Sequence, residues 1–487
     1  MPLPRRLIEA KSNLVFAFSL LWFVVRVAPK PSRIMYPCQR STLTLIFLRL
    51  GLGVAAISTS LTNLAKKRLV KVLLVSALII EISYPALLQG YYGVMYAFAA
   101  PQRMTLADVQ FGFPEHRIVE IQNPNATSWD FSTGYYWEYV DQGVVDQMVE
   151  QGVKALTDQP TAQAAWETIL SDYSDGDVVG IKINGNDFPN FLNNHNNINT
   201  EPHLINAIIR GVKTAAVPEA DIWVIEPSGG TSRYFPQYYY DIIHALYPNV
   251  PLMDRSDTSF GANAELLVTF PYTGNQYITD QMAEIDHLII VPIMKAITPS
   301  WGLTGAIKMM QGNIQSPGDL HNYLGRTSAD NPDVLIYQNP HIIGKTRLLV
   351  GDGLFGTWTG IHFTGGYGGT DSLSSPCNDI PKPWITFNDE APNCLFFGVD
   401  PVALDSVMYD HILAERNAQD QVGGQSLASF NEPQLIAGEA AGLGVRDHGP
   451  PYTEIDYIPE FPPALILPLL TMATLLVVFA YKMRREK

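Results

Sequence analysis

The chain of 487 residues contains only three cysteines, and none of them form a C-x-x-C pair. This absence excludes an iron–sulfur cluster and a four-cysteine zinc site. The sequence also contains no G-x-S-x-G or H-E-x-x-H motif, so neither a standard serine hydrolase nor a zincin is expected. Cys377 and Cys394 stand 17 residues apart. Outside a cell these two residues could form a disulfide.

Basic residues are scarce through most of the chain. Between residues 100 and 460 there are 16 Lys and Arg against 44 Asp and Glu, which gives a net charge of −28. A segment this acidic repels nucleic acid and anionic lipid, so we expect no nucleic-acid partner. The basic residues gather at the two ends instead, with 12 in the first 71 residues and four in the last six.

The C-terminal end combines a short motif, an apolar run and a basic tail. Pro459-Glu460-Phe461 precedes an apolar run of 18 residues at 464–481, which is about the minimum that crosses a bilayer as a helix. The basic residues of 482–487 favour a cytoplasmic tail and an extracellular main domain. This arrangement resembles the PEF-CTERM sorting signal of archaeal surface proteins, which implies an archaeosortase as a partner. A plain anchor helix is the alternative, and in both cases we expect a protein of the cell membrane and cell surface.

The first 99 residues are hydrophobic, and their best-formed segment lies at about 66–99. It has a basic start at 66–71, an apolar core at 72–80 and Ala97-Phe98-Ala99, which are the parts of a secretory signal. Glu81 interrupts the apolar core, and the segment lies well inside the chain. Two interpretations stay open: a signal peptide or signal anchor at about 66–99, or several membrane helices in the first hundred residues.

The following residues have the pattern of a globular domain. Apolar positions at helical spacing predict helices at 144–156 and 162–170, in an N-terminal helical part at 100–174. A short apolar run at 177–183, a helix at 203–215 and a strand at 221–225 together predict one βαβ unit. Further strands are expected at 287–293 and 346–350, a helix at 401–414 and a last helical piece at 421–447.

These elements predict an α/β fold at 175–447, with a mixed, mostly parallel sheet and flanking helices. A proline-rich linker with the sorting motif follows at 448–461, then a transmembrane helix at 462–481 and a basic cytoplasmic tail at 482–487.

Seven short motifs in order carry a resemblance to a family. They are Gly180-Ile181-Lys182-Ile183-Asn184, the helix and strand of 203–228, Pro292-Ile293-Met294-Lys295, Leu303-Thr304-Gly305-Ala306-Ile307-Lys308, Leu320-His321, Gly351-Asp352-Gly353 and Asp400-Pro401-Val402-Ala403-Leu404-Asp405. Together they resemble the family known as domain of unknown function 362, over residues 175–447. The resemblance implies an α/β fold and no assigned activity.

The chain departs from that family pattern in three places. Relatives usually read Lys-x-His where Lys295 is followed here by Ala296 and Ile297, and usually carry Asn where Met309 stands. Some relatives also have ferredoxin-type cysteine clusters, which this sequence lacks. A redox role suggested by those relatives therefore does not transfer to this chain.

Three lysines stand at or near predicted strand ends or loops, in a domain where lysine is rare. Ligands of parallel α/β sheets bind outside the carboxyl ends of the strands, so Lys182, Lys295 and Lys308 are candidates for holding a small anionic ligand. Asn184 adds a neutral donor and acceptor beside Lys182. The structural alternative is a lysine that extends away from a buried strand or pairs with an acid.

Candidate catalytic groups are two aspartates and one histidine. Asp352 follows an apolar strand between two glycines and suits a divalent cation or a substrate hydroxyl, although an Asp-Gly turn explains it equally well. Asp405 lies near the start of a predicted helix in apolar surroundings, and is the second candidate metal ligand. His321 lies in a loop near Asp319 and could serve as a general base. Asp400, by contrast, is expected to cap the helix that begins at Pro401.

The residues thus support two hypotheses of different classes. The first is a membrane-anchored extracellular α/β domain that is a metal-assisted enzyme or binds a small anionic ligand at its strand ends. The second is a non-catalytic surface protein that binds glycans or solutes through the aromatic stretches 129–139 and 234–240. Neither a substrate nor a reaction follows from the sequence.

Overall fold

The computed structural model describes residues 103–185, 196–227, 234–298, 300–359, 380–421 and 429–446, together with the backbone of 453–456. The predicted signal segment at 66–99, the transmembrane helix, the basic tail and Cys377 all lie outside these residues. Among the helices that are described, none is both long and apolar enough to cross a membrane. The described residues of 103–260, together with those from 268 onward, group in one compact unit.

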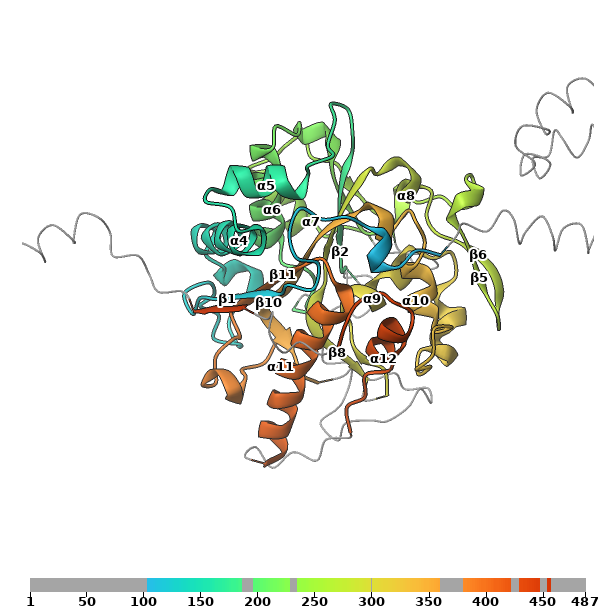
Figure 1. Ribbon diagram of the computed structural model, residues 1–487. Helices are drawn as coiled ribbons and strands as arrows, with labels where there is room; N and C mark the ends of the chain where they lie inside the picture. Colours follow the sequence, from blue (N-terminus) through green and yellow to red (C-terminus); the bar gives the residue numbers. More distant parts are fainter. Residues whose placement is uncertain are drawn as a thin grey trace, which may run out of the picture. The chain divides into compact units, whose positions relative to one another are not determined.

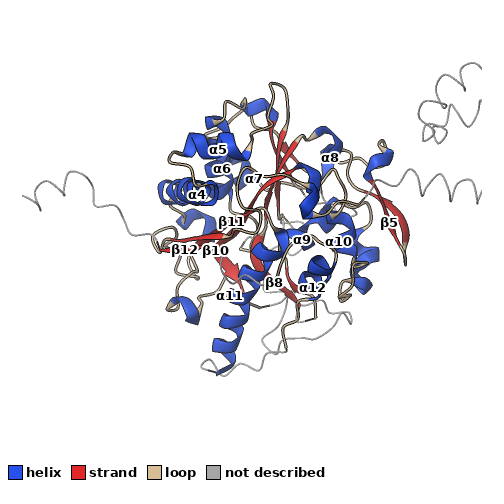
Figure 2. Cartoon of the chain, viewed as in Figure 1, coloured by secondary structure: helices blue, strands red, loops and turns tan. Residues whose placement is uncertain are grey.

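Helices and strands are interspersed along the chain (Figures 1 and 2). The strands are β1 (Val119–Gln122), β2 (Val179–Ile183), β3 (Ile222–Ile225), β4 (Leu252–Met253), β5 (Leu267–Phe270), β6 (Gly274–Tyr277), β7 (His287–Val291), β8 (Ile293–Thr298), β9 (Gly302–Leu303), β10 (Thr346–Thr357), β11 (Cys394–Gly398) and β12 (Thr453–Asp456). The helices are α4 (Gln142–Thr157), α5 (Ala162–Ile169), α6 (Pro202–Thr214), α7 (Gln237–Ile243), α8 (Gln281–Glu284), α9 (Ala306–Met309), α10 (Pro332–Tyr337), α11 (Pro401–Gln421) and α12 (Pro433–Ala440).

The main sheet has the strand order β12-β1-β11-β10-β7-β2-β3-β4, and β8 continues beside β10 and carries β9. Six strand pairs are parallel, namely β1 with β12, β2 with β3 and β7, β3 with β4, and β10 with β7 and β8. β11 runs antiparallel to both of its neighbours, and β9 is antiparallel to β8. The predicted mixed, mostly parallel sheet with flanking helices is therefore confirmed.

The strand order changes direction at β2. β3 follows β2 on one side through α6, whereas β7 and then β10 lie on its other side. In α/β sheets such a reversal marks the place, at the carboxyl ends of the strands, where ligands usually bind. Residues at the carboxyl ends of β2, β3 and β10 are therefore the candidates for ligand binding.

Helices cover both faces of the sheet. Figure 1 shows α4, α5, α6 and α7 grouped on one side and α9, α10, α11 and α12 on the other. On the first face, Ile181 and Val350 of the sheet belong to one buried cluster with Leu204 and Ile208 of α6. On the second, a Cβ placed on Gly351 would lie 3.0 Å from the sulfur of Met408 in α11, so the glycine permits close packing of helix on sheet.

Local signals explain why α6 begins where it does. Pro202 occupies the first turn, and Glu201 is the N-cap residue in extended conformation. Apolar residues at helical spacing, Leu204, Ile205 and Ile208, face the core and are fully buried. The sequence predicts this helix within one residue at each end.

The structure differs from the sequence-based expectation in several elements. The helix predicted at 401–414 continues to Gln421, and the strand predicted at 287–293 ends at Val291, before β8 begins at Ile293. β10 does not end at Val350 but continues to Thr357, because its later residues pair with β8 and β11. The part predicted as helical at 100–174 also contributes β1 to the sheet, since β1 pairs with β11 from far along the chain. β12 falls inside the segment predicted as a linker and pairs with β1.

Candidate functional site

A buried ion pair ends the two central strands. The ammonium of Lys182 in β2 lies 3.0 Å from a carboxylate oxygen of Glu226, which directly follows β3. Lys182 is 1 % exposed and Glu226 is 3 % exposed. The same Glu226 oxygen accepts a hydrogen bond of 2.8 Å from the backbone nitrogen of Gly185, and the ammonium donates to the carbonyl of Ile183. Lys182 is therefore paired with an acid, which was the structural alternative to a ligand-binding role.

Asp352 forms the second polar cluster, within β10. Its carboxylate accepts hydrogen bonds from the backbone nitrogens of Glu201, at 2.8 Å, and Leu354, at 3.2 Å. Burial, together with the nearby carboxylate of Glu201, raises the pKa of Asp352 to about 7, against the lowering effect of those two hydrogen bonds. A carboxyl group with this pKa can both donate and accept a proton near neutrality.

Glu201 adds a second buried carboxylate beside Asp352. It is 1 % exposed, and its Oε1 atom lies 2.7 Å from Nδ1 of His203 in the first turn of α6. Its other oxygen, Oε2, is buried and has no hydrogen-bond partner among the described residues. Burying a carboxylate oxygen without a hydrogen-bond donor costs free energy of folding, so a donor from outside the described residues would stabilise this atom.

Tyrosines surround the two carboxylates. The hydroxyl of Tyr136 accepts from the backbone nitrogen of Asn199 at 3.1 Å, and the hydroxyl of Tyr239 donates to the carbonyl of Thr200. Burial raises the pKa of both tyrosines well above 10, and the negative charges of Glu201 and Asp352 add to that rise. Both hydroxyls therefore stay protonated, and they hold the backbone of Asn199 and Thr200, directly before Glu201.

Lys182 and Asp352 lie on opposite faces of the sheet. Successive side chains in a strand alternate between faces. Ile181 and Ile183 belong to the core cluster under α6, so Lys182 between them faces the other way, towards Gly312 in the segment after α9. Asp352 stands two residues from Val350, on the α6 face. The single pocket expected from the sequence is thus divided into two clusters.

Asp405 supports a neighbouring segment of the chain. It is fully buried on α11 and accepts hydrogen bonds from the backbone nitrogens of Ala306, at 2.6 Å, and Ile307, at 3.1 Å, at the start of α9. A Cβ on Gly305 would lie 2.1 Å from its carboxyl carbon, so only glycine leaves room for this contact. Burial raises the pKa of Asp405 to about 7. Its contacts are those of a capping residue supplied from another helix.

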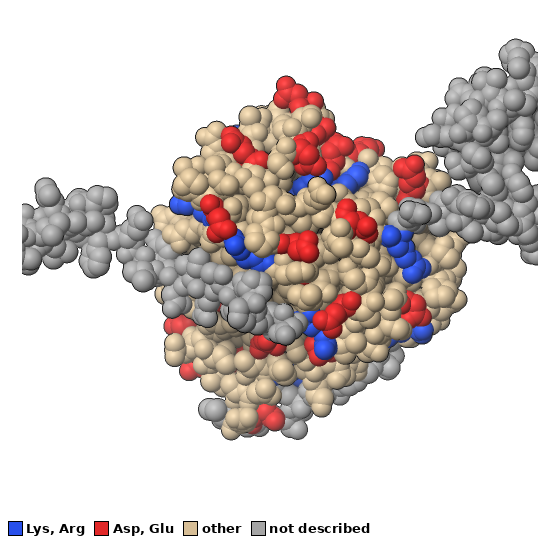
Figure 3. Space-filling model, viewed as in Figure 1, with Lys and Arg blue, Asp and Glu red and all other residues tan. Residues whose placement is uncertain are grey.

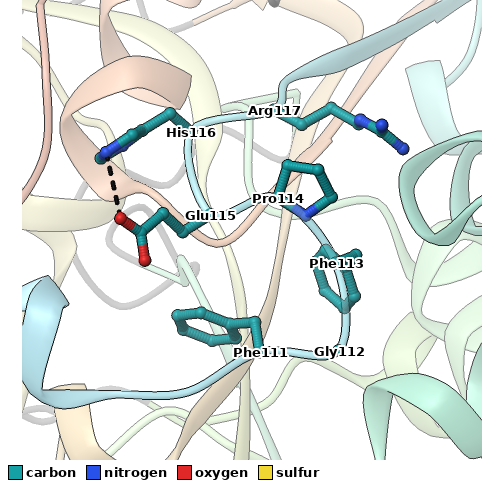
Figure 4. A pocket seen from close by; sticks show the side chains of 7 residues that line it. All are labelled: Phe111, Gly112, Phe113, Pro114, Glu115, His116 and Arg117. Carbon is teal, nitrogen blue, oxygen red and sulfur yellow. Dashed lines mark ion pairs between the residues drawn. The ribbon is translucent and has the colours of Figure 1, made fainter.

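The predicted capping role of Asp400 is confirmed. One of its oxygens accepts from the backbone nitrogens of Val402 and Ala403, both at 2.9 Å. The other oxygen lies 2.7 Å from Nδ1 of His116 and accepts from the backbone nitrogen of Val445 at 3.0 Å. Residues 111–117 line a hollow of about 620 Å³. Figure 4 shows their side chains and marks the ion pair between His116 and Glu115, whose charged atoms are 3.3 Å apart.

The other predicted ligand residues lie in several places. Lys295 is fully buried in β8, opposite Thr357 of β10. Lys308 is half-buried in α9 and donates a hydrogen bond to Gln311. Burial raises the pKa of Asp333 to about 7, and the positive charge of Lys308 opposes that rise. His321 is half-buried with its ring stacked on Trp301 at 5.6 Å.

Asn184 and Cys394 are both buried. The backbone nitrogen of Asn184 donates to the hydroxyl of Thr200 at 2.8 Å, which ties the end of β2 to the residue before Glu201. Cys394 begins β11, and its thiol lies 3.2 Å from the carbonyl of Pro392. Because Cys377 is outside the described residues, the disulfide stays a prediction.

Within the described ranges, no group of three or more His, Cys, Asp or Glu side chains is placed to hold a metal ion. Asp352 and Asp405, the two aspartates proposed as metal ligands, accept hydrogen bonds from separate segments of backbone.

The aromatic stretches contribute mainly to the core. Trp129, Tyr136 and Tyr239 are at most 4 % exposed, whereas Tyr135 and Tyr234 are 39 % and 44 % exposed. Most of these rings are therefore too buried to stack on a ligand at the surface, and Tyr135 and Tyr234 are the exposed exceptions.

The sequence did not single out Glu226 or Glu201. A signal was present for Glu226, because it follows β3 as Asn184 follows β2, and an acid was the expected partner of a buried lysine. Glu201 precedes Pro202 at a predicted helix start, so the sequence could have indicated its capping position. The sequence could not indicate that Glu201 lies near Asp352.

Among curated proteins, none matches this chain. Residues 179–410 match the model of the family described as Domain of unknown function (DUF362), which supports the resemblance carried by the seven sequence motifs.

Proposed function

We propose that the protein is a membrane-anchored cell-surface protein whose α/β domain binds a small polar ligand at the carboxyl ends of its strands. Asp352 would exchange a proton with that ligand, and Glu201 would accept a hydrogen bond from it. The observation that carries the proposal is the pair of buried carboxyl groups, one with a pKa near 7 and one with an unpartnered oxygen. Location rests on the C-terminal apolar run and basic tail alone.

The electrostatic cost of the site supports a functional role. Keeping a carboxyl group in surroundings that raise its pKa from 3.8 to about 7 disfavours the ionised form by about 4 kcal/mol. Buried acids with strongly shifted pKa values concentrate at functional sites. Structural roles also produce such shifts, as Asp405 illustrates through its two contacts with α9. The unpartnered oxygen of Glu201 distinguishes the Asp352 cluster from that case.

The charges nearby favour a ligand that donates hydrogen bonds. Two carboxyl groups and the hydroxyl of Tyr239, which donates to a carbonyl, offer hydrogen-bond acceptors around Asp352. A hydroxyl or amino group on the ligand would satisfy Oε2 of Glu201. An anionic ligand has less support than the sequence suggested, since Lys182 contacts Glu226 on the opposite face.

A ligand screen tests the proposal. Thermal unfolding of the purified full-length chain would be followed with neutral polyols, amines, carboxylates and phosphates, in the wild type and in Asp352→Asn and Glu201→Gln variants. We expect one hydroxyl- or amine-bearing class to raise the melting temperature of the wild type by a few degrees, with the shift lost in both variants.

Asp333→Asn is the matched control, because Asp333 is also a buried aspartate with a pKa of about 7 but lies in α10. It should keep the ligand-induced shift. An equal shift in all four proteins would place the ligand elsewhere, and the absence of any shift in the wild type would remove the proposed site.

A further inference from the structure

A cavity lies at the edge of the sheet where β1 ends, with β11 between β1 and β10. Three segments form its walls: the residues that follow β1, the residues that precede β11, and the middle of α11. Its volume is about 990 Å³, which is enough for a small oligomer of a polar ligand. β1 is antiparallel to β11, as is β10, so the carboxyl end of β1 lies at the same edge as that of β10.

The lining is composed of planar polar groups and aromatic rings. Gln122 and Asn388 supply amides, Asp130 and Glu390 supply carboxylates, and Phe387 and Trp129 supply ring surface. Among the lining residues, all of which lie within 103–185 and 380–421, there is no Lys or Arg. An anion would therefore enter a site with two carboxylates and neither Lys nor Arg among its described lining residues.

The walls are held in place by contacts beneath them. Thr127 donates to the side-chain oxygen of Asn393 at 2.7 Å, which joins the β1 segment to the β11 segment. His411 lies 3.1 Å from the buried carboxylate of Glu120, and its ring contacts Phe387 with centroids 5.7 Å apart. Such a preformed wall reduces the ordering cost of binding a ligand.

The two carboxylates of the lining differ in their own contacts. Asp130 accepts hydrogen bonds at Oδ1 from the backbone nitrogens of Ser132 and Thr133, and the side chains of the same two residues also hydrogen-bond to it. Glu390 is exposed, and its carboxylate forms no hydrogen bond or ion pair with the described part of the chain. Acceptors of this kind beside an aromatic ring suit vicinal hydroxyl groups whose sugar ring has an apolar C–H face.

From this lining we infer that the cavity binds a neutral carbohydrate. Hydroxyl groups of the sugar would donate to Glu390 and Asp130 and exchange hydrogen bonds with the amides, while one face of the sugar ring lies against Phe387. This site is separate from the Asp352 cluster, and its occupancy does not depend on the function proposed there.

Saturation-transfer NMR on the purified full-length chain tests this inference. The probes are glucose, galactose and N-acetylglucosamine, with glucuronate as the anionic comparison and spermidine as a non-sugar cation. We expect at least one neutral sugar to bind, with its ring C–H protons receiving the strongest transfer, and glucuronate to bind more weakly than glucose.

Variants then locate the binding. Glu390→Gln should weaken the sugar about tenfold, because a charge-assisted hydrogen bond is lost. Phe387→Leu should abolish transfer to the ring C–H protons. Asp389→Asn is the matched control, since it makes the same change of charge at the adjacent exposed residue, which does not line the cavity.

The inference has several ways to fail. Binding of spermidine alone, binding of none of the sugars, or equal sugar binding by the Glu390→Gln and Asp389→Asn variants would each overturn it. Circular dichroism of every variant, compared with the wild type, separates a lost contact from a lost fold. If Phe387→Leu does not fold, Glu390→Gln still decides the outcome.

Discussion

The backbone nitrogen of Glu201 donates a hydrogen bond of 2.8 Å to the carboxylate of Asp352, so the N-cap residue of α6 is fixed to the middle of β10. These two residues are 151 positions apart in the chain. Their contact brings one buried carboxylate next to another at the edge of the sheet where α/β proteins bind ligands. The predictions below concern this contact and the other buried charges around the sheet.

Asp352→Asn should flatten the pH dependence of stability. The folded-state pKa of Asp352, about 7, exceeds its ordinary value of 3.8, so the folded chain holds a proton that the unfolded chain has lost between these values. Stability from this group therefore falls as pH rises from about 4 to 7, by up to about 4 kcal/mol. Urea unfolding at pH 4.5 and 7.5 should show a smaller difference in the variant. An unchanged difference would contradict the shifted pKa.

Lys182→Met should destabilise the protein by about 3–5 kcal/mol, because Glu226 is left as an uncompensated buried charge. Adding Glu226→Gln should restore most of that loss, since the amide oxygen can still accept from Gly185. The free energies of unfolding of the wild type, both single variants and the double variant form the test. Additive losses would show that the two side chains are not coupled.

Gly305→Ala should destabilise the protein by about 1–3 kcal/mol, because the new methyl group collides with the carboxylate of Asp405. Gly318→Ala is the control, as nothing lies within 4 Å of the position its Cβ would take. That substitution should change stability by less than about 0.5 kcal/mol. Equal melting temperatures for both variants would mean that the Asp405 carboxylate does not cap α9.

The contact between His116 and Asp400 should weaken in alkali. The hydrogen bond with Asp400 raises the pKa of His116, and the charges of Asp400 and Glu115 add to that rise. Its contribution to stability is therefore complete below the unfolded pKa of about 6.5 and is lost as pH rises through the folded pKa. Unfolding of wild type and His116→Gln should differ more at pH 6 than at pH 9. A difference that grows towards pH 9 would contradict this assignment.

Local patterns made part of this fold predictable. β2, α6 and β3 follow from a short apolar run, helical spacing of apolar residues and a proline in the first turn. The cap formed by Asp400 was predictable for the same reason, because its hydrogen bonds reach only two and three residues along the chain.

Contacts between distant segments were not predictable. Asp405 looked like a first-turn carboxylate of its own helix, yet its oxygens bond α9 about a hundred residues away. Asp352 looked like a residue after a strand, because the pairing that extends β10 comes from β8 and β11. The alternation of side chains then places Lys182 and Asp352 on different faces of the sheet. The sequence pattern of a single strand cannot predict this, because it does not give the register between strands.

The most direct test of the account is the pKa of Asp352 in the folded chain. Carbon-13 NMR of aspartate carboxyl groups, titrated from pH 3 to 9 in the wild type and in Asp352→Asn, would assign its resonance by difference. We predict a carboxyl group that titrates near pH 7 and disappears in the variant. If the resonance lost in Asp352→Asn titrates at or below pH 4, Asp352 is an ordinary ionised carboxylate and the proposed proton-exchanging site is contradicted.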